Sequence, residues 1–353
     1  METPGDIDAI HRRFRTAGTA LMRANLNNTH SGNLSCRDPR DPGRFYVTAS
    51  GSQCGNLSAR DVVRVRFDDM SWEGPARPSS EANTHRRVLT LPGVNACAHC
   101  HSIAGTLLSF ESPREPAPLA GRGPRTTAPE ERVFQPVDCW GAGLLGPVTK
   151  GTYQRSVGSA EMEERIPGYL RQAPLTIVAG HGPFARGASL EECLHHLSVL
   201  ENSATVAIAL SRRGVDTPAL QRAIRARGSH PALPLPPRPL GGGGLLPDAA
   251  ADAATRPDFA YWLSYHFNLG LGAFGTGSMS RKLSADAMLF CPMSAAPEGV
   301  EVPLYLIPLR AGDPEAADVR LHRLVYAHTP FAACILASSP LATAEGMAAL
   351  AAA

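Results

Sequence analysis

Residues 94–101 of the chain read Val-Asn-Ala-Cys-Ala-His-Cys-His, an apolar run that ends in two histidines. If the run forms a strand, His99 and His101 point to the same side and can hold one metal ion. A third ligand is then needed from elsewhere in the chain. His181 follows a second strand-like run, Leu-Thr-Ile-Val-Ala-Gly at residues 175–180. The sequence therefore predicts one metal site that is built from the ends of two strands.

Small polar turns accompany these histidines. Residues 78–81 read Pro-Ser-Ser-Glu and precede a helix that we expect to begin near Asn83. Serine hydroxyls and exposed amides at a helix start suit an anion such as phosphate, although a plain helix cap is the alternative. Ser-Gly-Asn-Leu-Ser at 31–35 and Thr-Ala-Ser-Gly at 48–51 have the same character. Glu81 lies beside these hydroxyls, and a carboxylate near a metal can act as a general base.

The composition favours a globular protein that acts on a small molecule. Of 353 residues, 43% are hydrophobic and 19% are charged, which permits a sizeable core. The net charge of +2 argues against nucleic acid or an anionic membrane as the main partner. Apolar stretches are interrupted within about a dozen residues, so we expect no transmembrane helix. Residues 1–8 lack the order of a secretory signal, and eight scattered cysteines favour free thiols in the cytoplasm.

Helical and strand-like segments alternate irregularly, which predicts a layered α/β domain. Residues 7–21 carry apolar side chains at helical spacing, and residues 44–48 and 62–67 are typical of strands. A capping pattern begins a helix that we expect from about residue 190 to 213.

Two irregular stretches interrupt this pattern. Residues 112–131 are rich in proline, glycine and arginine and are expected to form a long surface loop. Residues 230–248 contain a proline-rich half and four consecutive glycines, which is typical of a linker. The linker would divide the chain into a first domain at 1–229 and a second at 249–353.

The second domain repeats part of the first. Three pairs of segments match in the same order: 84–89 with 321–326, 96–97 with 333–334, and 32–35 with 277–280. The first two pairs share an offset of 237 positions, and the third has an offset of 245. The residues that align with His99, His101 and Glu81 are Leu336, Ser338 and Asp318. We therefore expect a degenerate, truncated tandem copy that cannot hold a divalent cation.

Five motifs occur in the order Gly-Asn-Leu-Ser, Thr-Ala-Ser-Gly, Pro-Ser-Ser-Glu, His-Cys-His and Gly-His-Gly. In this order and spacing, residues 5 to about 215 resemble the class II aldolase and adducin family. The resemblance implies an α/β/α layered fold with a central, mainly antiparallel sheet. It implies that His99, His101 and His181 bind the metal and that Glu81 is the acid/base residue. It also places five residues at phosphate-binding positions: Asn33, Ser50, Gly51, Ser79 and Ser80.

The metal and the reaction follow from the same residues. We expect Zn²⁺, with Fe²⁺ or Mn²⁺ as alternatives, because three histidines do not choose between these ions. The expected enzyme is a lyase of carbohydrate metabolism that cleaves or rearranges a phosphorylated hydroxy-carbonyl compound through a metal-stabilised enediolate. Epimerisation, dehydration and decarboxylation stay open. An Fe(II)-dependent oxygenase or decarboxylase of secondary metabolism and a non-catalytic, adducin-like scaffold are the alternatives.

Two further points concern the proton donor and the assembly. The family's aldolases use a tyrosine between the second and third metal ligands, whereas residues 134–139 contain none and Tyr153 and Tyr169 lie nearby in sequence. The family forms fourfold rings with sites between subunits. The second copy keeps an apolar pattern, so we expect it to stand in for a neighbouring subunit in a pseudo-fourfold homodimer.

Overall fold

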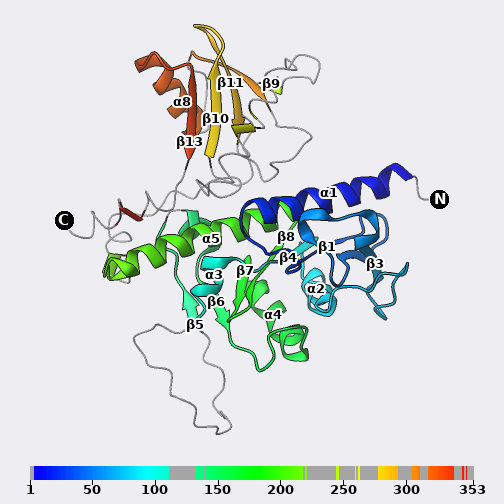
Figure 1. Cartoon of the computed structure of the whole chain (residues 1–353). Coiled ribbons are helices and arrows are strands. Elements are labelled where there is room, and N and C mark those ends of the chain that lie inside the picture. Colours follow the sequence, from blue (N-terminus) through cyan, green and yellow to red (C-terminus); the bar gives the residue numbers. More distant parts are fainter. Residues whose placement is uncertain are drawn as a thin grey trace.

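The computed structural model of the protein describes residues 4–110, 132–138, 140–217, 219–220, 244–245, 259, 261–262, 277–292, 304–310, 317–337, 344–345 and 347. The described strands form one sheet of eight strands and one of five (Figure 1). The surface loop expected at 112–131 lies outside the described residues, as does most of the expected linker. No helix in the described part of the chain is long and apolar enough to cross a bilayer.

The larger sheet is mixed and mainly antiparallel, as predicted. Its strands are β1 (Asn33–Arg37), β2 (Arg44–Thr48), β3 (Val62–Arg66), β4 (Ala96–His99), β5 (Arg132–Phe134), β6 (Val148–Gly151), β7 (Leu175–Val178) and β8 (Gly182–Gly187). They are arranged in the order β3-β2-β1-β4-β8-β7-β6-β5. All neighbours are antiparallel except β6 and β7, which are parallel. The strand that ends in His99 therefore lies inside the sheet rather than at an edge.

Helices cover both faces of this sheet. They are α1 (Pro4–Arg23), α2 (Ala82–Leu89), α3 (Ile103–Leu107), α4 (Ala160–Gln172) and α5 (Leu190–Arg212), with short helical turns η1 (Cys54–Asn56), η2 (Ala59–Asp61) and η3 (Gly141–Leu145). Figure 1 shows α1 and α5 on one side of the sheet and α2 and α4 on the other. The predicted start of α5 is confirmed, because the Ser189 hydroxyl accepts a hydrogen bond from the backbone N–H of Glu192.

The alternation of side chains along β4 separates two cores. Ala96, Ala98 and Cys100 belong to the core that α1 and α5 cover, together with Phe14. Cys97 belongs to the core that α2 and α4 cover. Successive strand residues point to opposite faces, so one apolar run fills both layers. Cys97 and Cys100 consequently lie on opposite sides of the sheet, and the described cysteines are all free.

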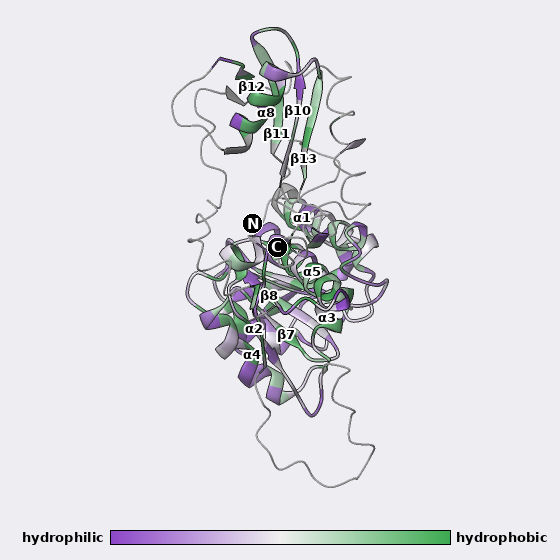
Figure 2. Cartoon of the chain, turned by 90° about the vertical axis from the view of Figure 1, so that its left-hand side faces the viewer, coloured by the Kyte–Doolittle hydropathy of each residue, from purple (hydrophilic) through white to green (hydrophobic). Residues whose placement is uncertain are grey.

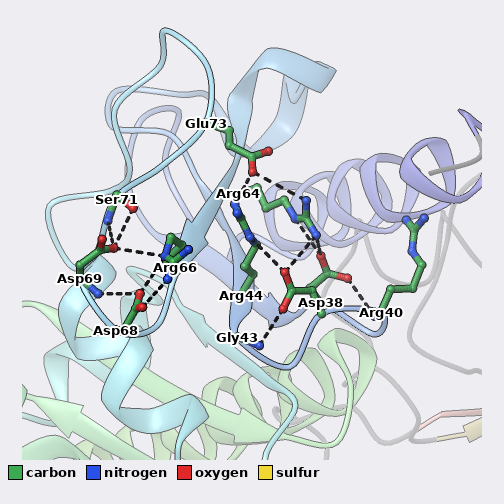
Figure 3. A network of polar contacts seen from close by, with 11 residues as sticks. Asp38, Arg40, Gly43, Arg44, Arg64, Arg66, Asp68, Asp69, Ser71 and Glu73 are labelled. Atoms are coloured by element: carbon green, nitrogen blue, oxygen red, sulfur yellow. Dashed lines mark hydrogen bonds and ion pairs between the residues drawn. The ribbon is translucent and has the colours of Figure 1, made fainter. Parts of the chain in front are cut away.

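Charged side chains form a network of ion pairs along the edge of the larger sheet at β3 (Figure 3). Asp38 follows β1 and is 4% exposed. Its Oδ2 accepts hydrogen bonds from Arg64 on β3, at 2.8 Å from Nε and 2.7 Å from Nη2. Arg44 on β2 is paired with Glu73. Paired charges along an edge strand stabilise the local fold and discourage pairing with another chain.

The smaller sheet has the order β13-β10-β11-β12-β9. Its elements are β9 (Gly244–Leu245), β10 (Gly277–Lys282), β11 (Ala287–Pro292), β12 (Tyr305–Pro308), helix α8 (Ala317–His328) and β13 (Ala333–Ala337). Within the stretch expected to be a linker, Gly244–Leu245 pairs its backbone with β12 and forms β9.

The smaller sheet has the topology of the first half of the larger one. The order β12-β11-β10-β13 corresponds to β3-β2-β1-β4, and a helix precedes the last strand in each case. Ser280 faces Cys334 across β10 and β13, just as Ser35 faces Cys97 across β1 and β4. The two sheets differ in what lies beyond β4 and β13, on the side away from β1 and β10. β4 pairs with β8, whereas β13 is an edge within the described residues, hydrophobic along its length (Figure 2) and with Ile335 48% exposed.

Candidate metal centre

Three histidines converge at the end of β4. His99 is its last residue, His101 lies two positions further on, and His181 lies in the turn between β7 and β8. One ligand nitrogen of each histidine lies within 4.8 Å of the other two. The Nε2 atoms of His99 and His181 are 3.3 Å apart. A tetrahedral ion about 2.1 Å from two nitrogens holds them about 3.4 Å apart, so these nitrogens fit one metal ion.

Two glycines allow the turn that carries His181. Gly180 has a φ of +71°, a left-handed conformation that favours glycine. At Gly182, an added Cβ would lie 2.1 Å from the carbonyl oxygen of Cys100. The close approach of β8 to β4 therefore requires glycine there. The Gly-His-Gly motif thus places His181 beside the end of β4.

Burial keeps the three rings neutral. It lowers the pKa of His99 well below its usual value and the pKa of His181 to about 3, and it also lowers that of His101. His99 stacks on Phe184, and its Nδ1 donates to the carbonyl oxygen of Pro183 at 3.0 Å. Its Nε2 therefore carries a lone pair. Neutral imidazoles fixed by an outer hydrogen bond are the form in which histidines bind a metal.

Glu81 lies against the histidines and is 3% exposed. Its Oε2 is 3.6 Å from His99 Nε2, and its Oε1 is 3.9 Å from His181 Nδ1. Burial raises the pKa of Glu81, while a hydrogen bond from Asn33 opposes that rise. Oε1 is buried and makes no hydrogen bond within the described residues, while the backbone N–H of Gly158 contributes to lowering the pKa of the carboxyl group. A carboxylate with these surroundings suits proton transfer.

Asn33 makes a direct hydrogen bond to Glu81. Its Nδ2 donates to Glu81 Oε2 at 2.7 Å, and its Oδ1 faces Nε2 of His85. The Asn33 side chain is 7% exposed. One of its two amide protons is therefore used by the glutamate, and its expected role as a phosphate ligand stays a prediction.

The other expected phosphate ligands lie on neighbouring loops. Residues 49 and 78 form an isolated bridge, and the Ser79 N–H donates to the carbonyl oxygen of Thr48 at 3.0 Å. The Ser50 N–H donates to the carbonyl oxygen of Arg77 at 2.9 Å. These bonds bring the loops at 48–51 and 77–81 side by side. The residues Ser50, Gly51 and Ser80 are exposed there, and Ser79 is half-buried.

Two residues that the motifs did not indicate hold the metal-ligand segment. Asn27 accepts a hydrogen bond from the His101 backbone N–H at 3.3 Å and donates to the carbonyl oxygen of Ser31. The Glu201 carboxylate accepts from the N–H groups of Ala104 and Gly105, both at 2.9 Å. The only sequence signal for Glu201 is a glutamate in the middle of an apolar helix.

The two tyrosines considered as proton donors gather around Arg165. The Arg165 guanidinium lies 4.8 Å from the ring centroid of Tyr153 and 5.8 Å from that of Tyr169. It also donates to the Tyr169 hydroxyl at 2.8 Å. Tyr153 packs over Gly151. The structure therefore places both tyrosine rings in a cation–π cluster around Arg165 of α4.

Known proteins resemble the part of the chain that holds this centre. The family model described as Class II Aldolase and Adducin N-terminal domain matches residues 12–208. A methylthioribulose-1-phosphate dehydratase from Microcystis aeruginosa is 28% identical over 199 residues, which cover 55% of this chain and 88% of the relative. A protein of the same name from Gluconobacter oxydans is 37% identical over 111 residues, 31% of this chain and 52% of the relative. The l-fuculose-1-phosphate aldolase of Thermus thermophilus has a TM-score of 0.47 at 24% identity, and the alignment covers 63% of this chain and 98% of that one.

The family match contains the three histidines and Glu81 and ends before the smaller sheet begins. It spans more than half of the chain. The resemblance inferred from five short motifs is thereby confirmed for the larger sheet and its helices: the chain belongs to the class II aldolase and adducin family.

Proposed function

We propose that the chain is a metal-dependent lyase of the aldolase type that acts on a phosphorylated hydroxy-carbonyl compound. The observation that carries the proposal is the meeting of three neutral histidines with one buried carboxylate. Their ligand nitrogens lie within 4.8 Å of one another, and Glu81 is 3.6 Å from the nearest of them. A divalent cation, when bound, supplies a Lewis acid for the oxygens of such a substrate. We expect Zn²⁺, with Fe²⁺ or Mn²⁺ as alternatives.

Among lyase reactions, we favour dehydration of a ketose phosphate. In this reaction the carbon next to the carbonyl loses a proton, the neighbouring carbon loses its hydroxyl group, and water leaves. Glu81 can take up the first proton and return it to the departing hydroxyl, so one acid/base group is enough. The relatives named as dehydratases support the same choice.

The phosphate group would bind on the loops beside the centre. Ser50, Gly51, Ser79 and Ser80 offer hydroxyls and backbone amides there, and α2 begins directly after them with its N-terminal end. Helix N-termini and exposed amides favour anions. Asn33 can contribute its second amide proton from the buried side.

A direct assay tests the reaction class. The metal-loaded protein is incubated with ketose 1-phosphates, including methylthioribulose 1-phosphate and fuculose 1-phosphate, and products are followed by mass spectrometry. Loss of one water supports dehydration, and two fragments indicate aldol cleavage instead. Oxygen consumption by the Fe²⁺-loaded protein would favour the oxygenase alternative. A protein that binds metal but converts none of these compounds would support a scaffold without activity and overturn the proposal.

We further propose that the smaller sheet derives from a partial duplication of the larger one. Strand order, the position of the helix and the register of Ser280 with Cys334 support this. A buried side-chain contact adds to it. Ser280 Oγ lies 2.6 Å from Nδ1 of His322, and Ser35 Oγ lies 2.6 Å from Nδ1 of His85. Because the metal-ligand positions are not retained, the second copy would serve assembly rather than chemistry.

The proposed assembly is a homodimer in which the smaller sheet covers a surface that a neighbouring subunit would otherwise cover. Large apolar side chains are exposed on both parts of the chain. Ile103 and Leu107 on α3 are 63% and 51% exposed, and Phe331 and Ile335 are 61% and 48% exposed. Contiguous exposed apolar surface indicates an interface. The free thiols of the described cysteines agree with a cytoplasmic location.

A further inference from the structure

His85 lies at the centre of a buried row of hydrogen bonds that ends on Glu81. It is fully buried in the first turns of α2, four residues after Glu81. On one side its Nδ1 is 2.6 Å from the hydroxyl of Ser35 on β1. On the other side its Nε2 contacts Oδ1 of Asn33. Asn33 in turn donates to Glu81 Oε2 at 2.7 Å. No motif assigns His85 a role.

The direction of these bonds follows from the carboxylate. If the Asn33 amide were reversed, its oxygen would face Glu81 Oε2 and repel it. The Asn33 oxygen must therefore point to His85, and Nε2 of His85 must donate the proton. Burial lowers the pKa of His85 to about 3, so the ring is neutral and carries one proton only. Its Nδ1 then accepts a hydrogen bond from the hydroxyl of Ser35 at 2.6 Å. The alternative acceptor for this hydroxyl proton, the Cys97 carbonyl oxygen, is farther away at 3.4 Å.

The smaller sheet contains a similar buried serine–histidine contact but, among the residues described there, has no metal-ligating histidines beside it. His322 contacts Ser280 at 2.6 Å through Nδ1 and Ser278 at 2.9 Å through Nε2. Ser278 occupies the place of Asn33, at the same register on the first strand of its sheet. A serine hydroxyl can satisfy the histidine, but it has no amide to hold a carboxylate. The hydrogen bond between serine and histidine therefore ties the first strand to the helix in both sheets. In the larger sheet, Asn33 extends this tie to Glu81.

We propose that His85 is a positioning residue: it fixes the orientation of the Asn33 amide, which holds Glu81 Oε2 and thereby keeps the carboxylate in place beside the metal ligands. This inference rests on the proposed catalytic role of Glu81. Oε2, the oxygen that Asn33 holds, lies 3.6 Å from the metal-facing Nε2 of His99, and Oε1 lies 3.9 Å from His181 Nδ1. A carboxylate held through one oxygen keeps the other at a fixed place for proton transfer, which is the requirement for efficient general base catalysis.

The proposal predicts a loss of kcat without a loss of binding. His85→Leu removes the donor to Asn33 and should lower kcat about 10- to 100-fold, the usual effect of losing an outer hydrogen-bonding partner. KM and metal content should change little. His85→Gln, whose amide can still donate to Asn33, should recover part of the rate. Asn33→Ser copies the smaller sheet, keeps a partner for His85 and should lower kcat in addition to any rise in KM from the lost phosphate contact, whereas for a pure phosphate ligand KM alone would rise.

The matched control is His322→Leu, which breaks the corresponding tie in the smaller sheet. It should lower the melting temperature in a similar way to His85→Leu but leave kcat unchanged. If His85→Leu and His322→Leu have equal effects on kcat, or if Asn33→Ser is fully active, the positioning role is overturned. Should His85→Leu fail to fold, Asn33→Ser and His85→Gln still decide, because both keep a polar group at each end of the tie.

A second readout does not depend on activity. Long-range ¹H–¹⁵N spectra of the histidine rings in the metal-loaded protein should show His85 with a proton on Nε2 and none on Nδ1. A proton on Nδ1 would reverse the bond to Asn33 and disprove the arrangement. Glu81→Gln separates the two proposals. If that variant remains active, the proposed function of Glu81 fails. If it is inactive while His85→Leu keeps its kcat, only the positioning role fails.

Discussion

His99 Nε2 lies 3.3 Å from His181 Nε2, although 82 positions separate the two residues in the chain. The proton of His99 is on Nδ1, which donates to the Pro183 carbonyl oxygen. The lone pair on Nε2 is therefore directed towards His181. Two nitrogens at this separation suit adjacent positions on one tetrahedral ion. The sheet order β4-β8-β7 produces the contact, because it brings the turn after β7 beside the end of β4.

We therefore expect one divalent ion per chain. Elemental analysis of protein purified without chelators should give about one equivalent, since three histidine ligands meet in one place. His181→Ala should lower the content sharply. His30→Ala, which removes an exposed histidine of another loop, is the control and should keep the ion. Two ions per chain, or an unchanged content in His181→Ala, would contradict the site.

Glu81→Gln tests the acid/base role. The substitution preserves the size of the side chain and removes the group that accepts a proton, so activity should fall by about 100- to 10,000-fold. Metal content and melting temperature should be retained. Glu73→Gln makes the same change in the surface network beside β3 and should leave activity unaltered. An active Glu81→Gln enzyme would show that another residue moves the proton.

The stability of the protein should depend on pH through its buried histidines. Burial, followed by His195, lowers the pKa of His196 to about 4, whereas an unfolded histidine has a pKa of about 6.5. Between these values the unfolded chain binds a proton that the folded chain does not. The free energy of unfolding should thus decrease as the pH falls below about 6.5, by up to about 1.4 kcal/mol per pH unit for one such group.

Urea denaturation at several pH values measures this slope. His196→Gln removes one of these groups, so its unfolding free energy should depend less steeply on pH between 6.5 and 4 than that of the parent protein. An equal slope in both proteins would mean that His196 is protonated in the folded state.

The phosphate proposal separates binding from chemistry. Ser80→Ala and Ser50→Ala each remove one neutral hydroxyl, a loss of about 0.5 to 1.5 kcal/mol that corresponds to a rise in KM of about two- to thirteenfold. kcat should stay near its original value, because the contact is the same in ground and transition state. Inorganic phosphate should compete with substrate. Ser71→Ala, on the distant turn before Glu73, is the control. Absence of competition would favour a substrate without a phosphate group.

Sequence patterns predicted the parts of the fold that local chemistry determines. The apolar run before His99 predicted β4 because both faces of a central strand are buried. The candidate ligands His99 and His181 were identifiable because each lies at the end of an apolar, strand-like run. The tight Gly-His-Gly turn is local as well, since it is fixed by the φ of Gly180 and the lack of space at Gly182.

Contacts between distant segments were not predictable in this way. Asn27, His85 and Glu201 support the site through hydrogen bonds to residues 50 to 97 positions away. Nothing in their own neighbourhoods marks them as partners. His85 fell within the expected repeat, which aligns it with His322, but the alignment did not reveal that both rings bind a serine on the adjacent strand. The strand at Gly244–Leu245 was missed because backbone pairing with β12 outweighs the flexibility of glycine.

The last prediction concerns assembly. The smaller sheet ends in β13, an edge strand within the described residues, although its counterpart β4 is covered by β8. Exposed apolar side chains on an unpaired edge are costly in water and are normally covered by a partner. We expect light scattering to give about twice the chain mass of 37.4 kDa. Ile335→Glu on β13 and Leu107→Glu on α3 should each shift the protein towards monomer. Leu283→Glu, at the tip of the β10–β11 turn and 51% exposed, is the matched control and should not.

Measurements of activity test whether the dimer is needed for the metal centre to work. Leu107 lies on α3, which begins two residues after His101, so an interface there would limit the access of water to the metal centre. The monomeric variants should then lose activity together with the dimer, and concentrating them should restore both. A chain that ends at Ser229 should behave like these variants, because it lacks the smaller sheet altogether. A full-length protein that is a monomer at all concentrations would rule out the proposed ring. A shortened chain with full activity and unchanged size would leave the smaller sheet without the role proposed for it, since the site would then be complete within the larger sheet alone.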